Sequence, residues 1–510
     1  MKYQALLLAI LISVISSALH AQDGSDADMP SDAELWPAKM ASGLLPKIRI
    51  TTEGHVPVID KDTKIPATLT LTAPTGYCTM YGTNPMTILD FPMTIKGRGN
   101  MSWLAAKKPY KLKFDKKIEL AGLPEHKHFS LIPFPGYLNY VSAVAGLEAA
   151  RCVGMEWAPH AEPVELILND VYMGRYFVVE NIKISKNRLN IFEQEDLCDD
   201  PELVPYGWLV EIDNNDDECQ IRIPENENME LKVTYHSPEE LSGRQLRWLT
   251  DEFTMLNEAV YADDRTGESW AQYIDATSAA RYFIVRELFG DPDGYAGSMY
   301  LYRDMGDDAK WHFGPIWDVA STHAEKEAWV KDSKIHYSLH WFPRIMATEA
   351  FHNALKEQWA LFRTKERQLY DFLDNLAIYV GPSDKPNLLR WEGLEYPLSA
   401  QRCATHYKNL LSRTIEWIDK AVRHYDFGTG AIEDIETDLP LLIDGRTVRL
   451  SPAVRSAEID VCNLSGQLVA TALLAGGEAH TFADIAPGVY ILRASAGGRR
   501  LQPASRLVIR

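Results

Sequence analysis

The stretch Gly290–Asp318, GDPDGYAGSMYLYRDMGDDAKWHFGPIWD, is the most informative part of this chain. Two runs within it, Ser298–Asp304 and Lys310–Asp318, are rich in aromatic and β-branched residues and are separated by the polar turn MGDDA. This pattern predicts a β-hairpin. Asp293 and Asp318 stand at the two ends of the unit, and acids at the ends of paired strands can converge on one cleft.

A pair of carboxylates in one cleft suits phosphoryl transfer. Such a pair can hold Mg²⁺ and accept a proton from an attacking hydroxyl. For an arbitrary pair of aspartates, a turn at Asp293 and a helix cap at Asp318 is the simpler interpretation. The residues around these two acids favour the functional interpretation.

The segment resembles the signature of the CotH kinase family, the spore-coat protein-kinase-like proteins, whose pattern runs roughly N-x-D…S-x-Y-x-Y-x-D…G-P-x-W-D. The matching positions are Asp293, Ser298, Tyr300, Tyr302, Asp304, Gly314, Pro315, Trp317 and Asp318. The resemblance implies catalytic roles for Asp293 and Asp318. Asp293 would orient or deprotonate the hydroxyl, and Asp318 would hold Mg²⁺.

A basic, glycine-containing segment, Lys96–Trp103 (KGRGNMSW), is followed closely by Lys107–Lys113 (KKPYKLK). Glycines beside Arg98 let backbone N–H groups approach an anion, and the guanidinium can grip phosphate with two donors. Strand alternation places Lys111 and Lys113 together on one face, and one such lysine could meet phosphates. A solvated basic face is the alternative for an isolated strand of this kind.

These segments also look like the family's R-G-N-x-S-W…K-K-P-Y-x-L-K signature. The resemblance implies that Arg98, Asn100, Lys108 and Lys113 bind the nucleotide. Among them, Lys113 is the residue expected to meet the α- and β-phosphates.

A third segment, Asn169–Gly174 (NDVYMG) with Tyr176 and Glu180, resembles the family's N-G-x-Y-x-G-x-Y-x-x-x-E. The turn itself requires only asparagine and glycine, so most of this motif is hairpin chemistry. Glu180 ends an apolar strand and could pair with the phosphate-binding lysine, as kinases require. A salt bridge without function is an equally open interpretation.

The acids of WLVEID, Glu211 and Asp213, alternate to one face and precede three more acids. We interpret them as a surface acidic loop, because the D-x-D-x-D-G spacing of a calcium loop is absent. The histidines also lack metal-ligand spacing, since no H-E-x-x-H occurs.

Three positions depart from the family pattern. Asp291 replaces the usual asparagine two residues before the catalytic aspartate, and Ala320 replaces the second acid of W-D-x-D. The segment Asn139–Ala145 lacks the usual Asp and Arg-Asn. Asp291 adds negative charge beside Asp293, which could raise the pKa of Asp293 or make Asp291 a second metal ligand beside Asp318. A weakened or lost kinase activity is therefore a second hypothesis.

The order of patterns predicts an α+β fold. Strands are expected between residues 46 and 117, at 163–169, 175–182 and 207–213, and helices at 141–153, 274–290, 341–379 and 399–425. A helix after residue 237 is expected to open with Ser237 and Glu240 as its capping box. The resemblance implies a two-lobed, protein-kinase-like domain with a β-rich N-lobe and a helical C-lobe. A cleft between the two halves is the expected ligand site.

The two ends of the chain differ from the rest in composition and pattern. Residues 1–21 are predicted to be a secretory signal peptide, with Lys2, an apolar run too short to span a bilayer and small residues at a cleavage site. Residues 22–45 are acidic and without periodicity, which is typical of a linker. The kinase-like domain is assigned to residues 46–430.

From residue 439 to residue 510, short alternating strands separated by turn signals predict a small Ig-like β-sandwich. Its pattern resembles the C-terminal sorting domain of the type IX secretion system of Bacteroidetes. The residues that carry this resemblance are Val461, Asn463, Gly466, Gly488, Tyr490 and Arg506–Arg510. The resemblance implies export through the periplasm, with the secretion machinery as a partner, to the cell surface or the medium. A carbohydrate-binding or adhesion sandwich is the alternative.

Composition excludes some functions. The net charge of −19 argues against nucleic-acid binding, because neutralising phosphates requires the opposite sign. No later stretch is long and apolar enough to be expected to span a membrane. The six cysteines include no C-x-x-C pair; Cys198 and Cys219 could form a disulfide or remain two free thiols.

Taken together, the sequence predicts a secreted or surface-attached atypical protein kinase that uses ATP and Mg²⁺ and phosphorylates hydroxyls of a protein substrate. The alternative is a catalytically weakened pseudokinase that acts as a surface binding or adhesion protein. A metal-dependent hydrolase that uses the same acids is a third hypothesis.

Overall fold

The computed structural model describes residues 31–136, 139–226, 229–291, 293–306, 308–319, 340–395 and 398–423, and, near the C-terminus, residues 441–444, 446–450, 456–463, 467–483, 485–496, 499–500 and 505–509. The chain divides into two compact units, Met1–Asp419 and Lys420–Arg510. The predicted signal peptide, Ala320, and the predicted domain boundaries at 430 and 439 lie outside the described residues.

The first unit begins with a closed seven-stranded barrel of order β1-β2-β3-β4-β5-β7-β6, in which β1 and β6 pair in parallel and the other neighbours are antiparallel. The strands are β1 (Lys47–Thr52), β2 (Ile65–Thr72), β3 (Ile88–Gly97), β4 (Tyr110–Leu120), β5 (Leu123–Ile132), β6 (Ala161–Leu168) and β7 (Val171–Glu180). The predicted strand-rich half is confirmed. Its closure into a barrel was not predicted.

Alternating side chains build the interior of the barrel. Along β4, Tyr110, Leu112 and Phe114 are buried in the barrel core, while Lys111 and Lys113 point outward. This confirms the predicted sharing of a face by the two lysines. Because one face of β4 fills the barrel, the lysines on its outer face can line the surface next to it.

The second half of the predicted linker is structured. Residues 31–45 include α2 (Asp32–Leu35) and the 3₁₀ turn η1 (Ala38–Met40), and they contact the barrel. The Ser42 backbone N–H donates to Glu165 Oε1 at 2.8 Å, and Leu45 is buried. This segment therefore forms part of the first unit.

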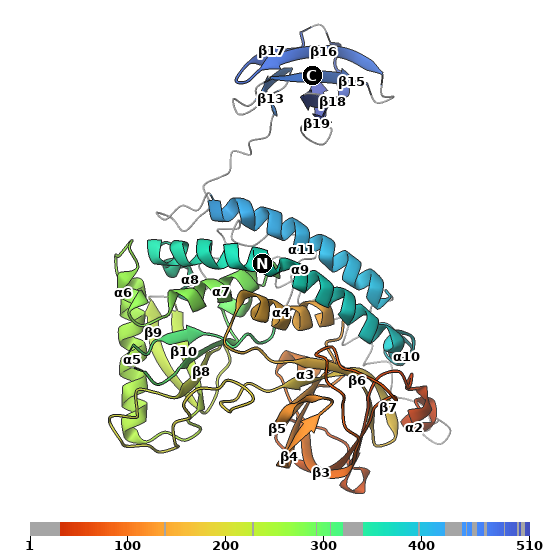
Figure 1. The fold of residues 1–510 in the computed structure, drawn as a ribbon, viewed down its shortest axis with the longest axis vertical. Helices are drawn as coiled ribbons and strands as arrows, with labels where there is room; N and C mark the ends of the chain where they lie inside the picture. Colours follow the sequence, from red (N-terminus) through yellow and green to blue (C-terminus); the bar gives the residue numbers. More distant parts are fainter. Residues whose placement is uncertain are drawn as a thin grey trace, which may run out of the picture. The chain divides into compact units, whose positions relative to one another are not determined.

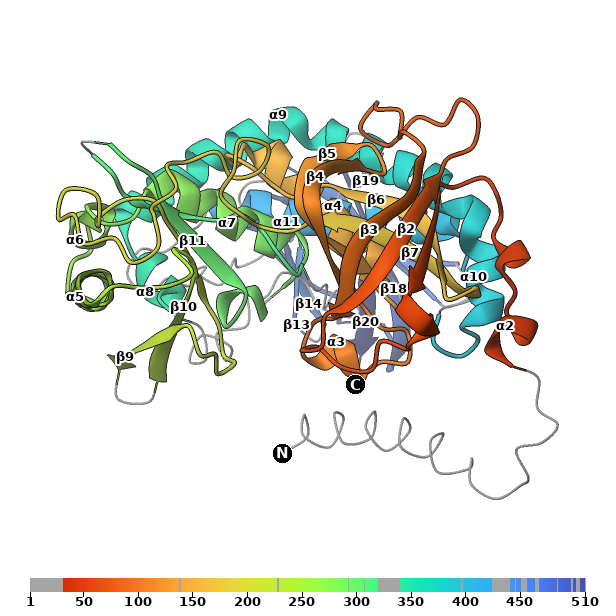
Figure 2. The same ribbon diagram turned by 90° about the horizontal axis from the view of Figure 1, so that it is seen from below.

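A second sheet of the first unit has the order β12-β11-β8-β10-β9. Its strands are β8 (Trp208–Ile212), β9 (Gln220–Asn226), β10 (Met229–Ser237), β11 (Met299–Arg303) and β12 (Trp311–Phe313). Strands β11 and β12 pair antiparallel, with Tyr302 opposite His312, which confirms the predicted hairpin. In Figure 2 the barrel strands β2 to β4 and the strands β10 and β11 lie on opposite sides, with α9 running along both.

Strands β9 and β10 were not predicted. Strand β10 continues through Ser237, so the following helix begins later than predicted. Ser237 ends β10 and precedes Pro238, a position that disfavours helical backbone. The cap of helix α5 lies five residues after the predicted cap residue, with Ser242 as the cap and Gln245 as its capping-box partner. The predicted Ser237 and Glu240 cap was therefore wrong.

Helices complete the first unit. They are α3 (Met101–Leu104), α4 (Asn139–Val153), α5 (Gly243–Tyr261), α6 (Glu268–Ala271), α7 (Ala276–Leu288), α8 (Phe342–Ile345), α9 (Glu349–Val380), α10 (Asp384–Arg390) and α11 (Ala400–Arg423), with the 3₁₀ turns η2 (Glu53–His55), η3 (Asp293–Tyr295) and η6 (Gly381–Ser383). Helix α9 packs on α4 and α7, as Figure 1 shows. Within the described residues, every helix is too short or too polar to cross a lipid bilayer.

The C-terminal unit has a core of its own, shared by two small sheets. The strands are β13 (Leu441–Asp444), β14 (Thr447–Leu450), β15 (Ser456–Cys462), β16 (Leu468–Ala475), β17 (Ala479–Thr481), β18 (Gly488–Ala496), β19 (Arg499–Arg500) and β20 (Ser505–Ile509). The predicted strand-rich texture of this region is confirmed. All six cysteines of the chain are free thiols, Cys198 and Cys219 included.

Candidate functional site

A cavity of about 750 Å³ lies between the barrel and the second sheet. Its lining includes the segment Arg98–Ser102 after β3, the start of α4, residues at the end of β8 and the start of β11, and Trp317–Val319 after β12. Asp293 and Asp318 both line it, so the hairpin brings the two predicted catalytic acids to one cleft. Arg98 and Asn100 line the same cavity.

The hairpin positions the two acids through its own backbone. Asp293 lies in η3, just before β11, and Asp318 follows β12. The Gly314 N–H donates to the Tyr300 carbonyl at 2.8 Å, which extends the pairing toward Asp318. Asp318 itself has a left-handed backbone with φ of 51°. Such a conformation costs a non-glycine residue energy and persists where the surroundings hold it.

A buried arginine from α7 holds both ends of the hairpin. The Arg286 guanidinium donates to the carbonyls of Trp317 (3.0 Å), Asp318 (3.4 Å) and Ser298 (3.4 Å). It also pairs with the Asp291 carboxylate at 2.5 Å. Arg286 therefore fixes the distance between the segment before β11 and the segment after β12.

Two glycines allow this close packing. A Cβ at Gly294 would approach Arg286 Cζ to 2.2 Å, so only glycine lets this turn lie against the guanidinium. A Cβ at Gly146 of α4 would meet Val319 at 2.6 Å, so glycine there lets the residue after Asp318 pack on the helix.

The structure places Asp291, a predicted metal ligand, in the ion pair with Arg286. It is fully buried, and its Oδ1 has no hydrogen-bond partner among the described residues. Burial raises the pKa of Asp291 to about 6, against the lowering effect of Arg286, while Asp293 and Asp318 raise it further. Asp291 therefore belongs to the buried group around Arg286 that holds the hairpin.

Neighbouring charges act on Asp318 in the cleft. The Asp318 side chain is open to the cleft, yet protein encloses it on enough sides that burial raises its pKa. Arg98 and Arg286 lower this pKa, whereas Asp293 and Asp213 raise it further. Asp213 therefore belongs to the same electrostatic group as the two predicted acids.

The acids of β8 lie in the cleft wall, which corrects their interpretation as a surface loop. Asp213 lines the cavity, and a Cβ at Gly297 would lie 3.1 Å from its Oδ1. Glu211 is buried and pairs with His236 at 2.7 Å. The ring of His236 stacks on Tyr300, with centroids 5.3 Å apart. The pairing of β8 with β11 brings these groups to the cleft.

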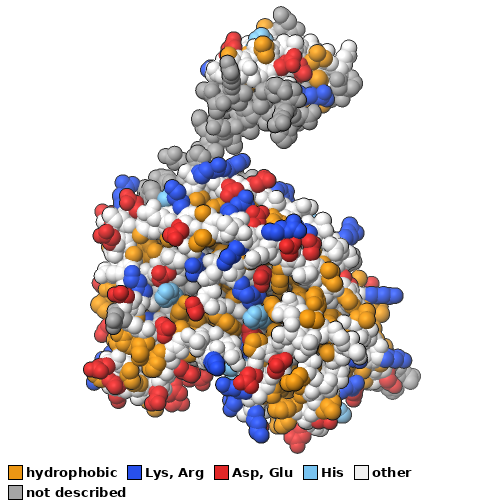
Figure 3. Space-filling view, in the orientation of Figure 1, with side chains coloured by type: hydrophobic (Ala, Val, Ile, Leu, Met, Phe, Trp, Pro, Cys, Tyr) orange, Lys and Arg blue, Asp and Glu red, His pale blue; other side chains and the backbone are white. Residues whose placement is uncertain are grey.

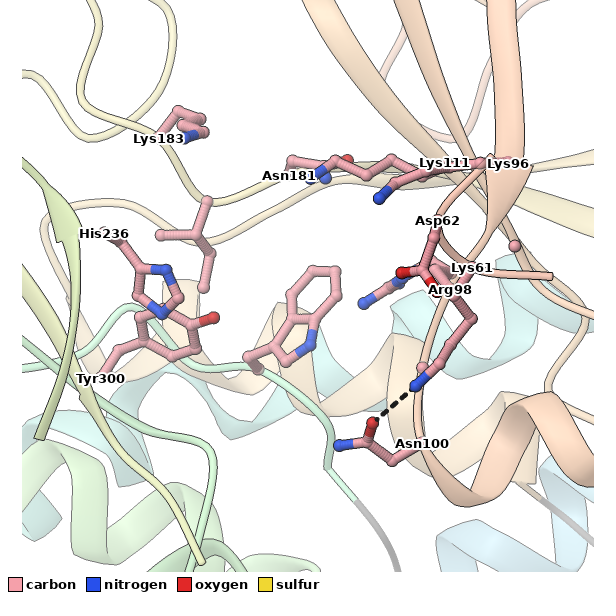
Figure 4. A pocket seen from close by; sticks show the side chains of 14 residues that line it. Lys61, Asp62, Lys96, Arg98, Asn100, Lys111, Asn181, Lys183, His236 and Tyr300 are labelled. Carbon is pink, nitrogen blue, oxygen red and sulfur yellow. Dashed lines mark hydrogen bonds between the residues drawn. The ribbon is translucent and has the colours of Figure 1, made fainter. Parts of the chain in front are cut away.

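Arg98 joins the larger cavity to a second, smaller one. Its guanidinium lies 5.0 Å from the centre of the Trp317 ring, and burial lowers its pKa while Asp318, Tyr300 and Glu211 counteract that effect. The second cavity, of about 380 Å³, is lined by Lys61, Asp62, Lys96, Gly97, Arg98, Gly99, Asn100, Lys111, Asn181, Ile182, Lys183, His236, Tyr300 and Trp317. Figure 4 shows Lys111 and Arg98 on the barrel side of it and Tyr300 and His236 on the opposite side.

The basic residues of the barrel divide between these cavities and the surface. Asn100 lines both cavities and accepts a hydrogen bond from Lys61 at 3.1 Å. Lys111 lines the smaller cavity, whereas Lys113, two residues along β4, is exposed and outside both cavities as the described residues define them. Lys108 donates to the Trp103 carbonyl at 2.6 Å and lies 5.0 Å from the centre of the Trp103 ring.

Lys107 lines the larger cavity, but its ammonium group is already bound by other side chains. Lys107 is fully buried and binds Glu395 at 2.8 Å and Asn387 at 2.9 Å. Burial lowers its pKa to about 8, and Glu395 opposes that shift. Lys107 therefore ties the barrel to the region of α10.

Glu180 is committed to other partners. Both Glu180 and Arg188 are fully buried and form an ion pair, and His160 Nδ1 lies 2.7 Å from Glu180 Oε2. The structure thus pairs this carboxylate with an arginine and a histidine. This arrangement agrees with the structural alternative, a salt bridge, rather than with a lysine partner.

Sequence reasoning missed Arg286, interpreted Asp213 as part of a surface loop and preferred Lys113 to Lys111. Arg286 lies on the predicted helix before the hairpin, where an arginine among apolar residues (FIVRELFG) was the available signal. Among the described residues, no group of three or more His, Cys, Asp or Glu side chains is arranged to enclose a metal ion.

A family model described as CotH kinase protein matches residues 95–421. The match begins in β3, ends in α11 and includes every residue that lines the larger cavity. It covers more than half of the 510 residues. No curated protein matches the chain.

Proposed function

Because this chain belongs to the CotH kinase family, we propose that it is an atypical protein kinase that transfers the γ-phosphoryl group of ATP to a hydroxyl of a protein substrate. The barrel and the helical part with its second sheet would act as the two lobes. One observation carries the proposal: Asp293, Asp318 and Arg98 line a single cavity of about 750 Å³. A cavity of roughly 300–1,000 Å³ is the size that small-molecule sites require.

The larger cavity offers different surfaces to the parts of a nucleotide. Ile132, Phe134, Leu147 and Val179 form an apolar wall that suits a base. Arg98, beside the glycine of its loop, faces the acids and suits the phosphates. Phosphoryl transfer depends mainly on positioning and on neutralising charge, and these groups supply both.

Each acid has a role that its position allows. Asp293 is exposed to the cavity and can orient the acceptor hydroxyl and accept its proton. Asp318 and Asp213 present further carboxylate oxygens beside it. Arg286 behind them keeps Asp318 in place through its backbone carbonyl.

Mg²⁺ fits this donor set. The ion takes one or two carboxylates and completes its shell with substrate phosphates and water, so a cage of three protein ligands is unnecessary. Asp318 would hold it, with Asp213 as the next available carboxylate. When bound, Mg²⁺ neutralises charge that develops on the phosphates.

The proposal is tested with purified full-length protein, Mg²⁺ and γ-labelled ATP, separating phosphoprotein from free phosphate. Asp318→Asn and Asp293→Asn should each lower phosphotransfer by at least about 100-fold, since each removes a charge used in the transition state. The matched control is Asp308→Asn, which removes an exposed acid from the turn of the same hairpin and should leave the rate unchanged.

Thermal stability measured with and without Mg²⁺ and ATP separates the alternatives. A kinase should be stabilised by the nucleotide, and this gain should shrink in Asp318→Asn. No stabilisation in either protein would contradict the proposal and favour a binding or adhesion protein. Release of free phosphate without phosphoprotein would favour a hydrolase.

We propose, further, that this kinase acts outside the cytoplasm, on a protein at or beyond the cell surface. The N-terminal apolar segment after Lys2 and the sorting-domain resemblance of the C-terminal strands support this placement. The C-terminal unit has its own core, as an appended Ig-like sorting domain requires. Fractionation of cells that express the full chain, with and without residues 441–510, tests it. Retention of both forms in the cytoplasm would contradict it.

A further inference from the structure

The smaller cavity is markedly basic in a chain whose net charge is −19. Four lysines and Arg98 line it, and Asp62 is its one lining carboxylate among the described residues. The lysines are Lys61, Lys96, Lys111 and Lys183. In Figure 3, Lys and Arg side chains gather beside the barrel strands β4 and β5.

Nearby carboxylates offset this charge only in part. Lys183 pairs with Glu239 at 2.6 Å, but Glu239 is exposed and does not line the cavity. Lys61 donates one hydrogen bond to the Asn100 side chain. Lys111 lies among Lys96, Lys183 and Arg98, and together with burial these cations lower its pKa to about 8. Binding of an anion lowers the electrostatic free energy of such a cluster, because it relieves the repulsion between the cations.

The nucleotide does not account for this cluster. The acids that need the γ-phosphate line the larger cavity, and so does the apolar wall that suits a base. Of the two cavities as the described residues define them, Lys61, Lys96, Lys111 and Lys183 line the smaller and not the larger. The two cavities meet at Arg98, Asn100, Tyr300 and Trp317. An anion in the smaller cavity would thus lie next to the transferring phosphoryl group, on the far side of Arg98.

We propose that the smaller cavity binds an acidic segment of the protein substrate, so that the chain prefers acceptor hydroxyls flanked by carboxylates. This inference rests on the proposed kinase function, because it assigns the acceptor a place beside the nucleotide. Carboxylate side chains would contact Lys111 and Lys96 while the acceptor hydroxyl reaches Asp293 in the adjoining cavity.

The experiment measures binding of a fluorescein-labelled peptide, a serine flanked by glutamates, to the full chain by fluorescence anisotropy. The control peptide carries glutamines in place of the glutamates. We expect the acidic peptide to bind at least about 10-fold more tightly at low salt and the difference to shrink at high salt. Equal binding of both peptides would overturn the proposal.

A pair of matched variants locates the site. Lys111→Gln should weaken binding of the acidic peptide by about 5-fold, the effect of removing one close charge. Lys117→Gln removes an exposed lysine from the same strand and should change binding by less than about 2-fold. Equal losses in the two variants would mean a diffuse surface effect and would overturn the assignment to this cavity. Melting temperatures confirm that both variants are folded.

Competition with a non-hydrolysable ATP analogue and Mg²⁺ separates the two proposals. If the analogue stabilises the protein and the acidic peptide still binds, both stand. If the analogue displaces the peptide, the lysines serve the nucleotide phosphates and the inference is wrong while the kinase proposal remains. Peptide binding without any stabilisation by the analogue would contradict the kinase proposal and the acceptor role together.

Discussion

At the scale of single residues, position on the strand decides which lysine lines the smaller cavity. Lys111 and Lys113 share the outer face of β4, but Lys111 lies toward the cleft end, opposite Lys96 of β3. Burial and neighbouring cations then lower the pKa of Lys111, whereas Lys113 stays exposed. The role of Lys113 as the phosphate-binding lysine stays a prediction from the resemblance, since a sequence pattern does not show where along a strand the cleft begins.

The lowered pKa of Lys111 leads to a pH dependence. Burial disfavours its charge most, Lys183, Lys96 and Arg98 disfavour it further and Glu239 favours it, so Lys111 loses its proton as the pH rises through about 8. The affinity for the acidic peptide should therefore fall between about pH 7 and pH 9. Anisotropy titrations across this range measure the effect, and Lys111→Gln should remove most of it. A flat profile in the unmodified protein would contradict this prediction.

At the scale of elements, the hairpin and α7 form one mechanical unit. Arg286 contacts carbonyls on both sides of the hairpin and the carboxylate of Asp291. Its own charge is maintained because Tyr282 and Asp291 raise the pKa of Arg286 more than burial lowers it. The substitution of Asp291 for the family's asparagine therefore stands beside a buried cation that it neutralises.

Removing the Arg286 guanidinium should destabilise the fold. Arg286→Met leaves Asp291 as an unpaired buried charge, so we expect the free energy of unfolding to fall by about 3–5 kcal/mol. Urea denaturation followed by circular dichroism measures the change. The double variant Arg286→Met with Asp291→Asn should recover part of the loss, because no buried charge is then left unpaired. A loss below about 1 kcal/mol in the single variant would show that the clamp contributes little.

At the scale of the whole molecule, the cleft is contained in one compact unit. All residues of both cavities lie between positions 61 and 319, and the unit extends to Asp419. The C-terminal unit has a separate core. The candidate site and the proposed sorting domain therefore lie in different units of the chain.

This division predicts independent unfolding. The full chain should show two transitions in differential scanning calorimetry, and a chain that ends at Arg423 should show one, with the same gain in stability from Mg²⁺ and ATP. The end point retains all of α11, which packs within the first unit up to Asp419. Loss of the nucleotide effect in the shortened chain would mean that the C-terminal unit supports the site.

The sequence by itself determined the features that depend on neighbouring residues. Alternation along β4 predicted that Lys111 and Lys113 share one face, and the runs around MGDDA predicted the hairpin that carries Asp293 and Asp318. These patterns are readable because side-chain direction has a fixed period along a strand. The family resemblance was readable for the same reason, since its motifs are local.

Only the tertiary structure decided which distant segments meet. The parallel pairing of β1 with β6 closes the barrel, and the pairing of β8 with β11 brings Asp213 beside the hairpin acids. Arg286 clamps the hairpin, while Glu180 turns to Arg188. Contacts of this kind depend on packing between segments far apart in the chain, and burial then sets which charges must be paired.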